Sequence, residues 1–529
     1  MSDTSEVETF EATAVNSATR RQPLYAARRK IFPKRVSGTF RRFKWIVMAV
    51  TLAIYYVTPW IRWDRGPHAP DQAVLIDLAN RRFYFFFIEI WPQEFYYIAG
   101  LLIMAGFGLF VITSSVGRAW CGYACPQTVW TDLFITIERW IEGDRNARMR
   151  LDKAPWTVSK LVRRITKHAI WIAVAVATGG AWVFYFADAP TLFMDLVTGT
   201  AAPVAWFTIA ILTATTYTFG GLMREQVCTY MCPWPRIQAA MMDENSLTVT
   251  YNDWRGEPRA RGSRRAIAEG RVVGDCVDCN ACVAVCPMGI DIREGPQLEC
   301  ITCALCIDAC DAVMDKIGKP RGLIEYTTLA QYQSNMRLAT PEGAGSHDPR
   351  RAYGSDGRLS DKVARFRLAQ LLRPRTLVYL AAWSLVGLAM LFTLIGRDRL
   401  QINVLADRNP QYVVLSDGSI RNGYTVKLLN MIPQPRRFTL SIEGLPGAAM
   451  SVNGIDESPA RSVSIEVEPD SLRALKVYVS QPRDSVTGAS QHFTFSVIEA
   501  DGPETAAPGT AAPETASYVA TFSAPEAVQ

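Results

Sequence analysis

The sequence predicts a multi-domain membrane protein: an α-helical transmembrane bundle of five spans with a cysteine-rich insert, followed by an all-β sandwich. Three observations predict this fold class. Five apolar runs without charged residues interrupt the 529-residue chain, all 12 cysteines lie between Cys121 and Cys310, and short alternating runs fill residues 400–529. Hydrophobic residues make up 49% and charged residues 20% of the chain, so apolar spans must alternate with soluble segments.

The five expected spans are residues 45–61, 95–117, 169–187, 196–223 and 376–396. A helix of about 17–25 apolar residues crosses a hydrocarbon core of about 30 Å. Buried helices of a large soluble protein are the alternative, but Trp, Tyr and Arg flank several of the runs, as is typical of membrane interfaces. The stretch 83–88 is too short to span, and we interpret it as an interfacial helix that leads into the second span.

The distribution of Lys and Arg predicts the orientation of the spans. Residues 1–44 and 118–168 carry ten Lys or Arg each, residues 62–94 carry four, and residues 188–195 carry none. Positive residues concentrate in cytoplasmic loops. We therefore expect the N-terminus and the segments 118–168 and 224–375 in the cytoplasm, and the chain from Arg397 onward on the outer side.

The expected domains follow the chain in order. They are a basic arm (1–44), a four-span membrane domain (45–223), a cytoplasmic module (224–335), a linker (336–375), the fifth span (376–396) and an outer domain (397–529). The net charge of only +6 does not favour nucleic acid as a partner. With 4 His, the chain also has too few imidazoles for a histidine-rich metal or haem site.

The strongest chemical signal is a pair of four-cysteine runs. They read Cys276-x2-Cys279-x2-Cys282-x3-Cys286-Pro287 and Cys300-x2-Cys303-x2-Cys306-x3-Cys310, with Asp311 in place of a second proline. This is the spacing of bacterial two-cluster ferredoxins, in which the fourth cysteine ligates the other cluster, whereas a zinc site would need two C-x2-C pairs. The sequence thus predicts a ferredoxin-like module with two [4Fe–4S] clusters, one on Cys276, Cys279, Cys282 and Cys310, and one on Cys300, Cys303, Cys306 and Cys286.

The other four cysteines form two C-x3-C-P segments, each just past an inward-running span. We name them the first hook (Cys121 to Pro126) and the second hook (Cys228 to Pro233). Thiols at i and i+4 share one helical face, and thiolates and thioethers such as Met231 favour Cu(I). The hooks therefore predict a redox or metal site, although a structural role is the alternative. The spacing alone leaves open whether Cys121, Cys125, Cys228 and Cys232 bind copper, hold a third cluster or cycle as dithiols.

The outer domain holds neither Cys nor Trp and shows a strand pattern. Expected strands are 412–415, 424–430, 437–443, 462–467, 474–480, 492–499 and 518–522, with turn signals such as Asn422-Gly423 between them. Seven short strands in this spacing predict an Ig-like sandwich, without the Cys and Trp core of antibody domains. Residues 501–516 are expected to form a long polar loop.

In this order of parts, the chain resembles the cytochrome c oxidase accessory protein family known as CcoG, FixG or RdxA. The resemblance covers nearly the whole chain. It rests on both hooks, both cysteine runs, the arm segment from Arg28-Arg29-Lys30 to Arg41, and the segment Asp417-Gly418-Ser419-Ile420-Arg421-Asn422-Gly423-Tyr424 that opens the sandwich. The cysteine runs occur in many ferredoxins, but their combination with the hooks and the outer domain is specific.

The resemblance implies a cupric reductase that supplies Cu(I) for the copper centre of cbb-type oxidases. It implies a multi-pass protein of the bacterial inner membrane with a periplasmic outer domain. The catalytic and copper-binding residues would then be Cys121, Cys125, Cys228 and Cys232, with Met231 as a further copper ligand. Expected partners are the lipid bilayer, copper chaperones or transporters, oxidase assembly components and an unidentified electron donor; a homodimer stays open.

Two other functions are compatible with the sequence. One is a quinol-oxidising membrane ferredoxin, whose quinol pocket would lie beside the aromatic stretch 83–97 with Glu89 and Glu94. The other is a scaffold for oxidase assembly in which the clusters are structural. Copper reduction by cluster-loaded protein would distinguish the three functions.

Overall fold

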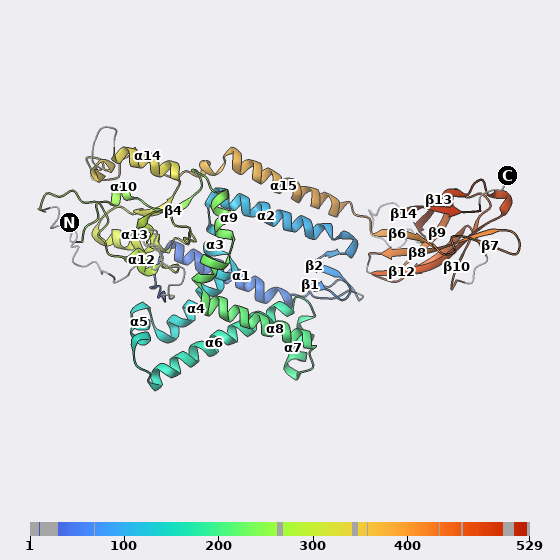
Figure 1. The fold of residues 1–529 in the computed structure, drawn as a ribbon, viewed down its shortest axis with the longest axis horizontal. Helices are drawn as coiled ribbons and strands as arrows, with labels where there is room; N and C mark the ends of the chain where they lie inside the picture. The colour runs from blue at the N-terminus through green and yellow to red at the C-terminus, as the bar shows by residue number, and fades with distance from the viewer. Residues whose placement is uncertain are drawn as a thin grey trace. The chain divides into compact units, whose positions relative to one another are not determined.

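The computed structural model describes residues 10, 30–67, 69–261, 268–340, 348–356, 358–432, 434–455, 459–500 and 513–525 (Figure 1). Most of the basic arm, including Arg28 and Arg29, and residues 501–512 of the expected polar loop lie outside the described residues. The chain forms two compact units, Met1–Ile61 with Ala73–Met390, and Arg62–Gln72 with Leu391–Gln529. The first unit contains the helices and the cysteines, and the second contains the sandwich.

Three described helices are long and apolar enough to cross a membrane. These candidate spans are Thr39–Trp60, Pro92–Val116 and Pro374–Ile395. They contain α1 (Thr39–Val57), α2 (Tyr96–Val116) and α15 (Pro374–Ile395), which match the first, second and fifth expected spans. At most 17% of each apolar window is buried inside the protein, so most of its side chains remain available to lipid.

The fourth expected span is not one helix. Helix α7 (Ala189–Thr198) ends at Gly199, whose φ of 79° is left-handed, and α8 (Pro203–Thr216) starts at a proline. Glycine after a helix and proline at its first position are the residues that end and start helices. The π-helix η4 (Tyr217–Met223) continues α8. Helix α7 meets this combined helix, Pro203–Met223, at 90°, so α7 and the combined helix count as one broken span at most.

The third expected span lies in α6 (Val158–Val183), which does not qualify as a candidate span in the described chain. This helix ends four residues before the apolar run does, and its first half carries Lys160, Arg163, Arg164 and Lys167. The described helices therefore give three spans, or four with the bent pair, and five spans stay a prediction.

The expected interfacial helix at 83–88 is wrong. The chain there forms an antiparallel three-stranded sheet of β1 (Val74–Asp77), β2 (Arg82–Phe85) and β3 (Ile88–Ile90), in that order. Aromatic residues favour strands, and positive φ values at Arg81 (57°) and Phe86 (51°) turn the chain between them. Tyr84, only 2% exposed, anchors the sheet.

Helices follow each hook. The first hook overlaps α3 (Ala119–Tyr123) and leads into α4 (Pro126–Glu142) and α5 (Arg145–Lys153), whereas the second overlaps the π-helix η5 (Val227–Met231) and leads into α9 (Trp234–Met241). Pro126 and Pro235 lie in the first turns of α4 and α9, where proline is tolerated because those N–H groups have no intrahelical partner.

A buried ion-pair network holds α4 against its neighbours. Glu138 lies 2.7 Å from Arg148, 3.0 Å from Arg224 and 3.4 Å from Lys167. Burial alone would raise the pKa of Glu138, but the positive charges of Arg224, Arg148 and Lys167 outweigh burial and lower it to about 2. The carboxylate therefore stays ionised inside the protein.

The cysteine-rich module is built on two helices and a small sheet. The strands β4 (Thr248–Tyr251) and β5 (Ile324–Thr327) pair antiparallel, and α12 (Ala281–Val285) packs against α13 (Leu305–Ile317). The core includes Met314, Leu323 and Ile324, each 1% exposed. The short helix α10 (Asp253–Gly256) and α14 (Leu329–Ala339) complete the module; Trp254 packs with Ala352 and Val363 of the expected linker.

The sandwich consists of two antiparallel sheets. One has the order β10-β12-β8-β6, with β7 paired to β8, and the other has the order β11-β9-β13-β14. The strands are β6 (Leu400–Ala406), β7 (Val413–Val414), β8 (Ile420–Asn430), β9 (Arg436–Glu443), β10 (Ala449–Val452), β11 (Ser462–Val467), β12 (Ser471–Gln481), β13 (Ser490–Glu499) and β14 (Thr515–Ser523). Each of the seven expected strands overlaps one of these, and β6 and β10 were not predicted. Tyr424, Phe493 and Phe495 meet in the core at ring distances of 4.9–5.6 Å.

Candidate redox site

The two cysteine runs adopt the same loop conformation. In the first run Asp278 and Asn280 have φ values of 51° and 58°, and at the same positions of the second run Thr302 and Ala304 have 51° and 60°. Left-handed residues at alternate positions coil the loop tightly, and α12 and α13 then start at the same offset. The sequence duplication is therefore also a duplication of backbone shape.

The buried thiols fall into two groups that cross the runs. Burial raises the pKa of Cys310, and the thiols of Cys282, Cys276 and Cys279 raise it further. Burial likewise raises the pKa of Cys286 to about 12, with contributions from Cys303 and Cys300 of the other run. Each fourth cysteine thus lies near the first three of the opposite run, as crossed ligation requires. The ligand assignment itself stays a prediction.

The chemistry of these two groups fits iron–sulfur clusters. Burial raises the pKa of Cys282 to about 12, although the charge of Arg293 lowers it, and burial also raises the pKa of Cys306. Without iron these thiols hold their protons, because a buried thiolate is costly. Cluster iron removes the cost by taking the thiolate as its ligand. Cys276, Cys279, Cys282 and Cys310 would hold one cluster, and Cys286, Cys300, Cys303 and Cys306 the other.

The two hooks meet, although 107 residues separate them in the sequence. Burial raises the pKa of Cys228 to about 12, and the thiols of Cys125, Cys121 and Cys232 raise it too. Burial also raises the pKa of Cys121 to about 11, against the opposing charge of Arg118. Four thiols from two distant segments therefore share one site.

Among the described residues, neither the hook site nor the two cysteine runs bring three His, Cys, Asp or Glu side chains together as the ligands of one metal ion. The Cys121 thiol instead donates a hydrogen bond to Oε1 of buried Gln238 at 3.0 Å. Met231, the expected thioether ligand, is 52% exposed, and its role stays a prediction.

The first hook packs directly on the second cysteine run. A Cβ on Gly122 would lie 2.6 Å from the carbonyl oxygen of Ile301 and 3.0 Å from Cα of Cys303, so the two backbones touch. The Tyr123 hydroxyl donates to the Cys303 carbonyl at 3.2 Å, and the Tyr326 hydroxyl donates to the Thr302 carbonyl at 2.6 Å. The hook site therefore adjoins the cluster site that contains Cys303.

Arg118 lies between the two sites. It is 4% exposed, donates to the Leu298 carbonyl, and its charge lowers the pKa of both Cys121 and Cys300, although burial dominates at each thiol. A fixed positive charge there stabilises thiolates and added electrons on both sides. Sequence reasoning treated Arg118 only as a cytoplasmic positive charge, although its position three residues before Cys121 was a usable signal.

Two further residues carried no signal in the sequence. Gln238 belongs to α9, and nothing in its surroundings marks it as a partner of Cys121. Asp308, between Cys306 and Cys310, accepts hydrogen bonds from the backbone N–H groups of Phe40 (3.2 Å) and Arg41 (2.7 Å). It thereby caps the N-terminus of α1 and attaches the cluster module to the first candidate span.

Comparison with protein families agrees with this division of the chain. Residues 223–329 match a 4Fe-4S dicluster domain, and residues 98–143 match a 4Fe-4S binding domain. Residues 390–524 match the model described as an IG-like fold at the C-terminus of FixG. The match to the 4Fe-4S binding domain, residues 98–143, contains only two cysteines, those of the first hook.

Three curated relatives align over most of their length. The nitrogen fixation protein FixG of Rhizobium meliloti is 64% identical over 518 residues, which is 98% of this chain and 97% of that protein. The proteins RdxA and RdxB of Cereibacter sphaeroides are 52% and 56% identical, over 91% and 84% of this chain and 96% and 88% of their own lengths.

Proposed function

The chain belongs to the FixG and RdxA family of iron–sulfur redox proteins, and we propose that it reduces Cu(II) to Cu(I) for assembly of the copper centre of a cbb-type cytochrome c oxidase. The observation that carries the proposal is the hook site, where four thiols gather beside the second cysteine run. Thiolates bind Cu(I) in preference to harder cations, so they favour the product of the reduction.

Each part of the site has a defined task in this proposal. A bound iron–sulfur cluster supplies single electrons, and one electron converts one Cu(II) to one Cu(I). Cys121, Cys125, Cys228 and Cys232 bind the copper substrate. The proton that Cys121 shares with Gln238 must leave when copper binds, because the thiolate is the ligand. Arg118 favours that loss, since it lies beside the thiol.

Cu(I) accepts two thiolates, so a pair of the four hook thiols is enough to bind it. We place the site at the cytoplasmic end of the spans in the bacterial inner membrane, with copper chaperones or transporters and oxidase assembly components as partners. The electron donor is a further partner, and a homodimer is compatible with this function.

The proposal is tested with a variant in which Cys121, Cys125, Cys228 and Cys232 are all serine. Anaerobically purified protein, reduced and given Cu(II), is assayed for Cu(I) formation, Cu(I) binding and iron content. We expect the variant to keep about eight iron, since two complete four-cysteine runs remain, and to lose both copper activities. Met231→Ala is the milder comparison, with weaker Cu(I) retention only.

Two outcomes would change the assignment. If the four-serine variant reduces Cu(II) at the normal rate, copper takes electrons directly from the clusters, and the hooks have another role. If the wild-type protein holds about twelve iron and the variant about eight, the hooks hold a third cluster. Absence of cupric reduction by the wild-type protein with both clusters intact would instead favour the scaffold function.

The quinol-oxidising alternative has no support from its expected residues. Glu89 lies 3.5 Å from Arg82 of the neighbouring strand, and Glu94, 3% exposed, accepts the backbone N–H of Trp91 at 3.1 Å. Both carboxylates thus have structural partners and are not placed as free proton acceptors.

A further inference from the structure

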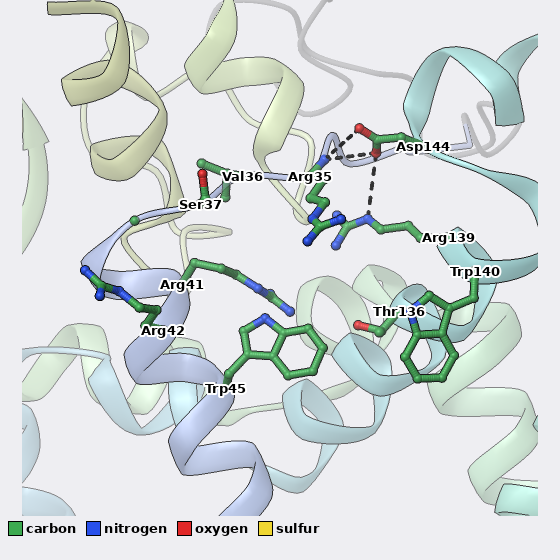
Figure 2. Close-up of a pocket in the computed structure, with 11 residues that line it drawn as sticks. Arg35, Val36, Ser37, Arg41, Arg42, Trp45, Thr136, Arg139, Trp140 and Asp144 are labelled. Atoms are coloured by element: carbon green, nitrogen blue, oxygen red, sulfur yellow. Dashed lines mark hydrogen bonds and ion pairs between the residues drawn. The ribbon is translucent and has the colours of Figure 1, made fainter. Parts of the chain in front are cut away.

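A cavity of about 690 Å³ lies between the N-terminal turns of α1 and the helix α4, apart from the redox site (Figure 2). Arg35, Arg41 and Trp45 line it from the first segment, and Arg139 and Trp140 line it from α4. Figure 2 shows the side chains of Arg35, Arg41 and Arg139 directed toward a common space, whereas Arg42 points away from it. Three guanidinium groups therefore converge here from two elements.

The acidic groups at the cavity do not use all the donors of these arginines. Arg41 is 6% exposed; its Nη1 donates to Asp132 at 2.9 Å, but its Nη2 is buried without a hydrogen-bond partner among the described residues. Asp144 accepts the backbone N–H of Arg35 at 2.9 Å and lies 3.9 Å from Nε of Arg139. Two carboxylates, Asp132 and Asp144, thus accompany the three guanidiniums.

The crowding of positive charge is unfavourable without a further anion. Burial and the nearby Arg41 and Arg148 lower the pKa of Arg139 to about 10, although the charges of Asp132 and Asp144 raise it. The Arg41 guanidinium also lies 4.9 Å over the ring of Trp45, which compensates its charge only in part. An anion in the cavity would offset this excess of positive charge.

The position of the cavity indicates the kind of anion. It lies at the first turns of the candidate span Thr39–Trp60, where a membrane helix passes from hydrocarbon to headgroups. Trp45 and Trp140, 41% and 77% exposed, are the residue type that concentrates at this level. Basic pockets between membrane helices on the cytoplasmic side suit anionic headgroups.

We propose that this cavity is a binding site for an anionic phospholipid of the cytoplasmic leaflet. The headgroup phosphate accepts hydrogen bonds from Arg41, Arg35 and Arg139, and the two tryptophans cover the boundary between headgroup and acyl chains. The lipid would thereby stabilise the contact between α1 and α4.

The test uses the full-length protein in detergent, delipidated and titrated with phosphatidylglycerol or phosphatidylcholine, with bound lipids counted by native mass spectrometry. We expect saturable binding of one phosphatidylglycerol and no comparable phosphatidylcholine binding. Arg35→Gln removes an exposed side chain and should weaken phosphatidylglycerol binding about fivefold. Arg41→Gln should weaken phosphatidylglycerol binding further. If this substitution of a buried residue impairs folding, the Arg35→Gln variant still tests the site.

Arg163→Gln is the matched control, because Arg163 is an exposed arginine of α6 outside the cavity. Its lipid binding should equal that of the wild type. Equal losses in Arg163→Gln and Arg35→Gln, or no loss in Arg35→Gln, would overturn the site. Complete displacement of phosphatidylglycerol by an equal concentration of inorganic phosphate would overturn the choice of lipid and leave a free-phosphate site.

Discussion

At the scale of single residues, the thiols of Cys286 and Cys310 distinguish crossed from local ligation. Each ends one run but lies near the first three thiols of the other. Cys310→Ser should therefore remove the cluster built on Cys276, Cys279 and Cys282, with a loss of about four iron, because a cubane needs four ligands. Electron paramagnetic resonance of the reduced protein should show that the signal of the Cys300 run persists. Loss of that signal, with the Cys276 signal intact, would contradict crossed ligation.

Gly122 is a second residue whose substitution has a specific expected effect. An alanine Cβ would come within 2.6 Å of the Ile301 carbonyl oxygen, so the hook and the second run must separate. Such overpacking costs about 1–3 kcal/mol. Hydrogen exchange of Gly122→Ala should therefore accelerate about fivefold or more in residues 119–124 and 300–304. Gly106→Ala is the control, since nothing lies within 4 Å of an added Cβ there; equal exchange in both variants would refute the contact.

At the scale of elements, the ion-pair network of α4 gives a prediction for stability. The pKa of Glu138 falls from 4.5 to about 2 in the folded protein, which corresponds to about 3 kcal/mol of stabilisation. Because the folded pKa is the lower one, this stabilisation is present above pH 4.5 and is lost as the pH falls toward 2. Glu138→Gln should lower the melting temperature at pH 7, and its difference from the wild type should shrink between pH 4.5 and pH 2.

The matched control is Glu269→Gln. Glu269 also pairs with an arginine at 2.7 Å, but its side chain is 46% exposed, and exposed pairs contribute little. Melting followed by intrinsic fluorescence across this pH range should leave Glu269→Gln within error of the wild type. An equal loss of stability in both variants would show that the burial of the network is irrelevant.

Elements were predictable from sequence where a local pattern determines them. The seven expected strands overlap observed strands because alternation and turn residues are local signals. The hydropathy of the apolar run 196–223 did not indicate the break between α7 and α8, although Gly199 and Pro203 mark it. At 83–88 the aromatic residues were interpreted as an interfacial helix, but they satisfy a strand's alternation, with Tyr84 inward.

At the scale of the whole molecule, spacing in the sequence identified the cysteines but not their neighbours. The iron–sulfur character and the family follow from motifs that lie within short segments. The hook site, Arg118 beside Cys300 and Asp308 beneath α1 depend on contacts between segments more than 100 residues apart. Such contacts leave no local pattern, so only the three-dimensional structure shows that the hooks adjoin the second run.

The number of spans decides on which side of the membrane each part lies. With the N-terminus in the cytoplasm, three or five spans place the chain after Arg399 outside, whereas four spans place it inside. Only five spans also export Asp188. Since the segment 188–195 lacks Lys and Arg, we expect five spans.

Alkaline phosphatase fusions after Asp188 and Arg399 should then be active, and fusions near Arg150 and Lys319 inactive. An inactive Asp188 fusion with an active Arg399 fusion would establish three spans and leave the α6–α8 region on the cytoplasmic side. Inactivity of both fusions would make the bent pair a fourth span and place the sandwich inside the cell.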